Sequence, residues 1–261
     1  MILGTCQLNV CQSQEEIRPW LEKISAQAGP GFWLFPELTI GGFDYANKEK
    51  WISLTPDILE LLAVFCKDTG HAIAIGLWEQ AKVKLHNSLF LMLPHWSNPQ
   101  CIYQKMHLFP LSREAEEFYP GQIIPRPIKW KGVTFGFGVC FDLRFPELFR
   151  YQNSHEQVDV FLLSAQWPLK RLEHWQTLLS ARAIENQSYF LAGNGCGSSI
   201  LGPLAGHSCL ITPWGEKKYC LKSSPGLSHA RFELKDVQET RSLFQTGRCD
   251  FFSVNSSSDQ T

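Results

Sequence analysis

The chain has 261 residues, of which 44% are hydrophobic and 19% are charged, a composition that excludes a mostly disordered protein. Its formal net charge of −1 gives no general attraction to nucleic acid or to an anionic membrane, and we expect neither as a partner. The first residues, MILGTCQLNV, lack the pattern of a signal peptide, and no apolar run has the length of a membrane span. We therefore expect a cytoplasmic protein.

Secondary-structure signals alternate along the chain. In chain order, the sequence predicts a strand over 32–37, a helix over 55–70, strands over 71–78, 87–93, 101–105, 133–140 and 159–167, a helix over 173–187, strands over 188–194 and 207–213, and a helix over 234–244. Thr55 is the expected cap of the first helix, Pro56 fits its first turn and Gly70 its end. Long apolar strands interleaved with helices are typical of a layered α/β domain. We expect one domain over residues 1–252 and a disordered tail over 253–261.

The nine cysteines show no C-x-x-C spacing, so the sequence predicts no metal site. Most of them are expected to be small buried residues. Cys140 differs because it ends the predicted strand 133–140 and precedes a helix start expected at Pro146. Glu37 and Lys105 also lie at the ends of predicted strands, where α/β folds place their sites. A carboxylate base, a cation and a thiol are the groups that a cysteine-based acyl transfer needs.

Three segments resemble the catalytic segments of the nitrilase superfamily of carbon–nitrogen hydrolases, in their order and rough spacing. They are LFPEL (34–38), YQKMHLF (103–109) and GVCFDLRFPEL (138–148), and further matches follow at HWQTLLSARAIENQ (174–187) and GHSCLITPWGE (206–216). The resemblance implies a four-layer α-β-β-α sandwich, and it implies homodimers that join two sandwiches through helices.

Carried over residue by residue, the resemblance makes Glu37 the general base, Lys105 the cation that stabilises the oxyanion and Cys140 the nucleophile. The backbone N–H of Phe141 is the implied second oxyanion donor. Many family members have a second active-site glutamate, and Glu114 lies at the matching distance from Gly121 in LSREAEEFYPG (111–121), with Glu116 and Glu117 as alternatives. The implied mechanism uses neither a metal nor an organic cofactor.

The residues after Cys140, Phe-Asp-Leu-Arg, follow the pattern of the amidase branches, and SAQWPLKRLEHW (164–175) is similar to the ω-amidase group. This branch implies a small amide substrate such as α-ketoglutaramate, whose carboxylate needs a cation. Arg171 is the candidate cation, because its planar guanidinium fits a carboxylate. The alternative for Arg171 is a solvated loop charge.

Phe43, Tyr45 and Trp167 are candidates for the wall of an acyl pocket, although Tyr45 and Trp167 can equally be packing residues. A salt bridge between Asp142 and Arg144 is expected to organise the loop after Cys140. Other family activities (deaminated glutathione amidase or N-carbamoyl amino acid hydrolase) and a catalytically silent binding protein remain as alternatives.

Overall fold

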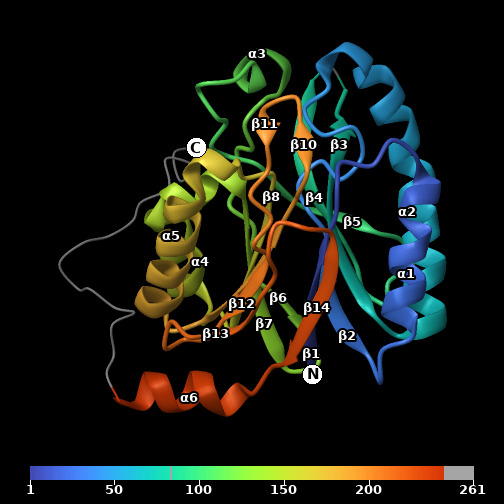
Figure 1. Cartoon of the computed structure of the whole chain (residues 1–261). Coiled ribbons are helices and arrows are strands. Elements are labelled where there is room, and N and C mark those ends of the chain that lie inside the picture. Colours follow the sequence, from blue (N-terminus) through green and yellow to red (C-terminus); the bar gives the residue numbers. More distant parts are fainter. Residues whose placement is uncertain (83, 244–261) are drawn as a thin grey trace.

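The computed structural model describes residues 1–82 and 84–243, in which two β-sheets pack face to face between helices (Figure 1). Helices α1 and α2 lie against the outer face of one sheet, and α4 and α5 lie against the outer face of the other. This arrangement confirms the predicted four-layer α-β-β-α sandwich. The predicted disordered tail, residues 253–261, lies outside the described residues.

The first sheet has six strands, with parallel pairing at β1–β2 and β2–β3 and antiparallel pairing elsewhere. Its order is β14 (Gly226–Arg231), β1 (Ile2–Gln7), β2 (Gly31–Leu34), β3 (Ala72–Gln80), β4 (Leu85–Met92) and β5 (Gln100–Gln104).

The second sheet also has six strands, of which β7, β8 and β9 are parallel. Its order is β13 (Lys217–Cys220), β12 (Cys209–Ile211), β9 (Tyr189–Asn194), β8 (Val160–Ala165), β7 (Val133–Val139) and β6 (Ile128–Trp130). A short hairpin, β10 (Ser198–Ser199) with β11 (Gly202–Pro203), lies apart from both sheets.

The helices of the described part are α1 (Arg18–Ser25), α2 (Lys48–Thr69), α3 (Glu114–Glu117), α4 (Pro146–His155), α5 (Leu172–Asn186) and α6 (Leu234–Leu243). Short 3₁₀ helices occur at Gln14–Glu16, Tyr45–Asn47, Cys140–Arg144 and Leu169–Arg171. No helix among the described residues has the length and apolar character needed to cross a membrane.

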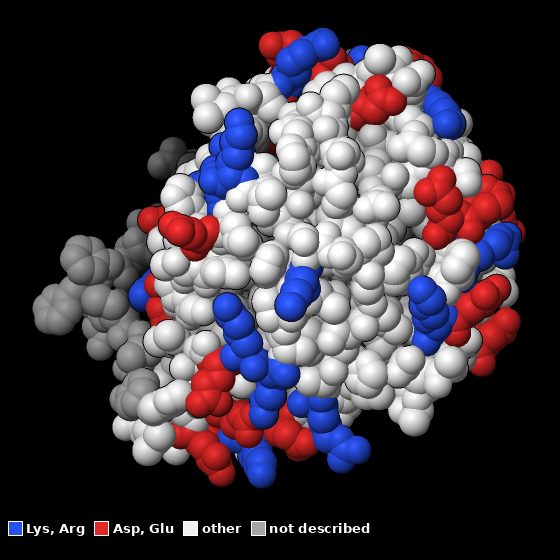
Figure 2. Space-filling model, in the orientation of Figure 1, with Lys and Arg blue, Asp and Glu red and all other residues white. Residues whose placement is uncertain are grey.

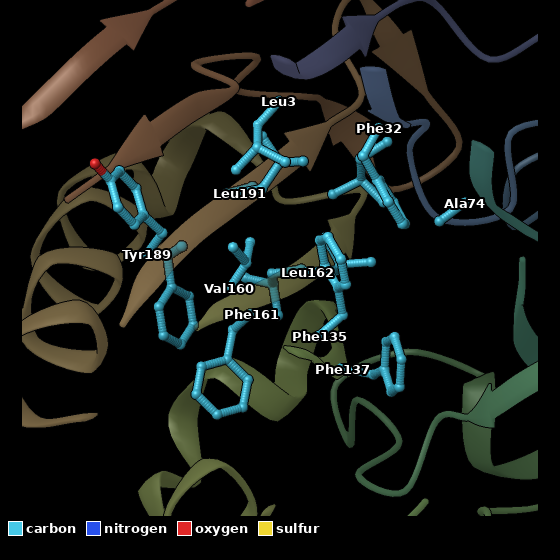
Figure 3. Packing of buried hydrophobic residues seen from close by; sticks show 14 of the residues in the cluster. Leu3, Phe32, Ala74, Phe135, Phe137, Val160, Phe161, Leu162, Tyr189 and Leu191 are labelled. Carbon is cyan, nitrogen blue, oxygen red and sulfur yellow. The ribbon is translucent and has the colours of Figure 1, made fainter. Parts of the chain in front are cut away.

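The main core lies between the two sheets, where side chains from both inner faces meet (Figure 3). Phe32 of β2 stacks on Phe135 of β7, with ring centroids 4.6 Å apart. Every residue of β8 is buried, as expected for an apolar strand covered on both faces. The two sheets therefore share one hydrophobic core, which fixes their strand ends relative to each other.

Helix α2 begins at Lys48, so the prediction that Thr55 caps a helix over 55–70 was wrong at its start. Thr55 is buried within the helix, and its hydroxyl donates to the carbonyl of Trp78 in β3, at 2.9 Å. Pro56 is tolerated inside the helix because tertiary packing, which includes the buried Trp51, outweighs the lost backbone hydrogen bond. The predicted end is confirmed: Gly70 has a φ of 75°.

Charged side chains on the face seen in Figure 2 are of both signs and lie mainly toward its edges. The upper middle of this face, over the β10–β11 hairpin, is largely free of charge. Ile200 at the tip of that hairpin is 67% exposed. This face therefore shows no single-sign patch of the kind that would attract a polyanion.

Candidate active site

A buried ion cluster joins three of the predicted site residues. The Lys105 ammonium, directly after β5, donates to Glu37 Oε1 at 2.8 Å and to Glu114 Oε1 at 2.7 Å. The side chains of all three residues are fully buried. Buried charges are stable only when they are paired and hydrogen-bonded, so this cluster is a specific arrangement and not an incidental surface contact.

Two amides complete the cluster. The Asn87 side chain, in β4, donates to Glu37 Oε1 at 2.7 Å and to Glu114 Oε1 at 3.1 Å. The backbone N–H of Gln166, after β8, donates to Glu37 Oε2 at 2.9 Å, and its side-chain amide donates to the Glu37 carbonyl at 2.8 Å. Both oxygens of the Glu37 carboxylate are therefore held in place.

Glu114 differs from Glu116 and Glu117 in its contacts with the buried cluster. Glu114 lies in the cluster and also accepts a hydrogen bond from the Phe109 N–H at 2.6 Å. Glu116 is an exposed partner of Arg113, and Glu117 pairs with Lys48 and Arg113. Only Glu114 of the three contacts Lys105 among the described ion pairs.

Cys140 lies at a sharp turn between β7 and the 3₁₀ helix Cys140–Arg144. Its φ is +48°, a left-handed conformation that is uncommon for a residue with a β-carbon. Such backbone strain costs of the order of 1–3 kcal/mol and persists only where the surroundings enforce it. The turn points to a functional reason for having a cysteine at this position.

Asp142 holds this turn. Its buried carboxylate accepts hydrogen bonds from the Val139 N–H at 2.9 Å and the Tyr103 hydroxyl at 2.8 Å. It also accepts from the His107 N–H at 3.0 Å and contacts His107 Nδ1 at 2.7 Å. The predicted salt bridge between Asp142 and Arg144 was wrong, since these four contacts occupy the carboxylate and Arg144 points to the pocket described below.

The electrostatics keep the Cys140 thiol protonated at rest. Burial and the Glu37 carboxylate raise its pKa well above the usual value, while Lys105 acts in the opposite direction. Burial lowers the pKa of Lys105, but Glu114 and Glu37 outweigh that effect and raise it well above its ordinary range. Both shifts favour a neutral thiol at Cys140 and a charged ammonium at Lys105.

Cys140 opens into a small pocket. Its lining residues are Phe43, Lys105, Phe109, Cys140, Phe141, Arg144, Gln166, Trp167, Pro168, Arg171 and Leu201. The pocket walls are aromatic, and two guanidinium groups lie over them: Arg144 is 5.1 Å from the Trp167 ring and Arg171 is 4.8 Å from the Phe109 ring. Burial and the neighbouring Arg171 lower the pKa of Arg144.

Of the predicted pocket residues, the structure brings Phe43, Trp167 and Arg171 to the pocket together with Phe141. It does not place Tyr45 there. The Tyr45 ring packs against Phe43, with centroids 6.2 Å apart, and against Trp78 and Phe118.

Sequence reasoning missed three residues of the site: Asn87, Arg144 and Gln166. Asn87 was visible as a polar residue at the start of a predicted apolar strand, but nothing in the sequence indicated its partners. Arg144 lies inside the motif around Cys140, but it was predicted to pair with Asp142. Gln166 lies inside SAQWPLKRLEHW, and no role was predicted for it.

Similar proteins were found by sequence and by structure. The 2-oxoglutaramate amidase of Bacillus subtilis is 31% identical over 236 residues, which cover 85% of this chain and 85% of that protein. The deaminated glutathione amidase of Rattus norvegicus is 31% identical over 218 residues, covering 76% and 66%. Shorter alignments with proteins called hydrolase in agr operon, from Staphylococcus lugdunensis and Staphylococcus aureus, span only 49% and 59% of those proteins.

The crystal structure of XC1258 from Xanthomonas campestris, described as a CN-hydrolase superfamily protein with an arsenic adduct in the active site, has the same fold. Its TM-score is 0.86 at 24% identity, with 95% of this chain and 96% of that chain covered. The carbon-nitrogen hydrolase family model matches residues 2–242, which is nearly all of the described chain. The fold and the sequence match agree, and the protein belongs to the carbon–nitrogen hydrolase family.

Proposed function

We propose that the protein is a thiol-dependent amidase of the ω-amidase type, which hydrolyses the terminal carboxamide of a small acid such as α-ketoglutaramate. The products are the carboxylate and ammonia, and the intermediate is a thioester on Cys140. The observation that carries the proposal is the pocket that joins Cys140 and Lys105 to two arginines. That pocket combines groups for the chemistry with groups that recognise an anion.

In the first half-reaction, Glu37 takes the thiol proton as the Cys140 sulfur attacks the amide carbonyl carbon. This coupling is needed because the raised pKa of the free thiol disfavours a resting thiolate. The Lys105 ammonium and the Phe141 N–H stabilise the oxyanion of the tetrahedral intermediate, where loss of one donor typically costs about 3–4 kcal/mol of barrier. The C–N bond then breaks, and the nitrogen leaves as ammonia with the proton from Glu37.

In the second half-reaction, Glu37 takes a proton from a water molecule, whose oxygen attacks the thioester carbonyl. The C–S bond breaks and the sulfur recovers its proton from Glu37. One carboxylate therefore acts as base, acid and base in turn. Glu114 and Asn87 contact neither bond that changes; they hold Glu37 and Lys105 in position through the hydrogen bonds described above.

The two arginines favour a substrate that carries a carboxylate. Arg144 and Arg171 both line the pocket, and neither forms an ion pair with a carboxylate among the described residues. Two neighbouring guanidinium groups repel each other, and a bound carboxylate relieves that repulsion. The aromatic walls then enclose the short chain between the carboxylate and the amide.

The relatives support this substrate class without separating its members, because the 2-oxoglutaramate amidase and the deaminated glutathione amidase are equally identical to this chain. Ammonia release should therefore be measured with α-ketoglutaramate, succinamate, an N-carbamoyl amino acid and a simple nitrile. We expect the first to react with the highest kcat/KM. No turnover of either α-ketoglutaramate or succinamate would overturn the ω-amidase assignment.

The Cys140→Ala variant tests the chemistry. It should fold and release no ammonia, while the Cys101→Ala variant, which alters an exposed thiol on β5, should retain full activity. Turnover by the Cys140→Ala variant would remove Cys140 from the mechanism. A folded wild-type protein that turns over no member of the panel would favour a silent binding protein on this fold.

We also propose a homodimer and a cytoplasmic location. The dimer is inferred from the family resemblance, and light scattering should give twice the chain mass of 29.8 kDa. The location is supported by the cysteines of the described residues, which all carry free thiols, as is usual in a reducing compartment.

A further inference from the structure

Two cysteines lie opposite each other on the edge of the second sheet, outside the residues that line the Cys140 pocket. Strand β13 is the edge strand, and it pairs antiparallel with β12 so that Cys220 faces Cys209 in register. Side chains of directly opposite residues project from the same face of a sheet. Cys209 is buried, with 2% of its surface exposed, whereas Cys220 is exposed.

This register is compatible with a disulfide. Opposite residues of an antiparallel pair have Cα atoms about 4.5–5.5 Å apart. A disulfide accepts Cα distances of about 4.4–6.8 Å. The two strands can therefore be joined at this position with little movement of the backbone, although both thiols are free in the structure.

The surroundings activate the exposed member of the pair. His207 Nδ1 lies 3.9 Å from the Cys220 sulfur. The pKa of Cys220 is lowered to about 6 by a hydrogen bond with the Cys209 thiol, by His207 and by the nearby Lys217. The hydrogen bond between the two thiols raises the pKa of Cys209. Cys220 is thus the attacking thiolate and Cys209 the resolving thiol.

Cys101 on β5 provides an internal comparison. It is also exposed, but burial of its sulfur and the Glu79 carboxylate raise its pKa to about 12. Its cross-strand neighbour is Phe90, so it has no cysteine opposite it. Exposure alone therefore does not make a reactive pair in this protein.

We propose that Cys209 and Cys220 form an oxidation site, in which a hydroperoxide converts the two thiols into a reversible cross-strand disulfide. The site is independent of the proposed amidase activity, because it uses neither Cys140 nor its pocket.

The reaction balances with the peroxide as the oxidant. The Cys220 thiolate attacks one peroxide oxygen, the O–O bond breaks, and the departing hydroxide takes a proton to leave as water. The resulting Cys220 sulfenic acid is attacked by the Cys209 sulfur; the S–S bond forms, the S–O bond breaks, and the second hydroxide leaves with the Cys209 proton as water. Two thiols lose two electrons in total, and one hydrogen peroxide becomes two waters.

The test treats the purified full-length protein with a small excess of hydrogen peroxide, blocks the remaining thiols and maps peptides by mass spectrometry. We expect a linked pair of peptides that contain Cys209 and Cys220, and we expect dithiothreitol to separate it. Iodoacetamide should label Cys220 at least tenfold faster than Cys101 in the untreated protein, because its larger thiolate fraction outweighs the lower nucleophilicity of a more acidic thiol.

Two variants make the test specific. In Cys209→Ser, peroxide should stop at the Cys220 sulfenic acid, which dimedone traps. In Cys220→Ser, the linked peptide should be absent and Cys209 should stay a thiol. The proposal is overturned if the wild-type protein gives no linked peptide, or if Cys101 is labelled as fast as Cys220. Since these readouts do not use substrate, a failed amidase assay leaves them unaffected.

Discussion

Replacing Asp142 by Asn should destabilise the fold, although the two side chains have nearly the same shape. The carboxylate accepts from Val139 and Tyr103 at one oxygen and from His107 at the other. Asn has one oxygen, so in its better orientation it still accepts from Val139 and Tyr103, while its NH₂ group faces the His107 side. The His107 Nδ1 can adapt by accepting, but the His107 backbone N–H then faces another donor.

The magnitude follows from these contacts. A lost hydrogen bond to a charged group costs about 1.5–3 kcal/mol. A hydrogen bond to a charged group is roughly twice as strong as a bond between neutral groups. The bonds from Val139 and Tyr103 that Asn retains are therefore weakened, which adds about 0.5–1 kcal/mol to the loss. The expected loss is about 2–4 kcal/mol in the free energy of unfolding, with a lower kcat because the turn at Cys140 is held less firmly.

Urea denaturation measures this loss as a shift of the midpoint at constant slope. The matched control is Glu116→Gln, which makes the same chemical change at an exposed ion pair and should alter the free energy of unfolding by less than about 0.5 kcal/mol. If Asp142→Asn costs no more than Glu116→Gln, the reasoning about the Cys140 turn is wrong.

Three further predictions concern the backbone, the pH dependence and the pocket. Gly41→Ala should lower the urea midpoint more than Gly132→Ala, because both glycines have positive φ but only a β-carbon at residue 41 would meet Trp51, at 2.3 Å; equal shifts would contradict this. Burial lowers the pKa of His71 below its usual 6.5, so the unfolded state takes up the proton first. Stability should therefore fall as the pH drops below about 6.5, and His71→Gln should show a smaller fall over this range; parallel pH profiles would refute this. Arg171→Met should raise KM for α-ketoglutaramate by about tenfold or more with a smaller change in kcat, whereas an unchanged KM would identify Arg171 as a solvated loop charge.

The sequence was sufficient for the parts of the fold that depend on local pattern. Apolar runs predicted β7 and β8. Strand ends made Glu37, Lys105 and Cys140 candidates, but it was the resemblance to a known family that grouped them into one site. The sequence failed where long-range packing decides. The start of α2 depends on burial of Trp51, which a local reading of Thr55 and Pro56 cannot detect.

The same limit applies to the site. Asn87 and Gln166 act through hydrogen bonds to Glu37 that join residues about 50 and about 130 positions apart in the chain. Whether a polar residue makes such a contact depends on which strand ends lie close together in the two sheets. The hydrophobic periodicity of the sequence carries no information about which strand ends are close. Arg144 was missed as a site residue because it was predicted to pair with Asp142, and the direction of its side chain depends on how the 3₁₀ turn leaves β7.

The left-handed backbone at Cys140 also bears on how this protein can change over evolutionary time. Glycine adopts a φ of +48° without steric cost, whereas a β-carbon there costs about 1–2 kcal/mol. A relative that lost its chemistry would be free to replace the cysteine by glycine and gain stability. The Cys140→Gly variant should accordingly be more stable than Cys140→Ala, because only the β-carbon makes this backbone conformation costly.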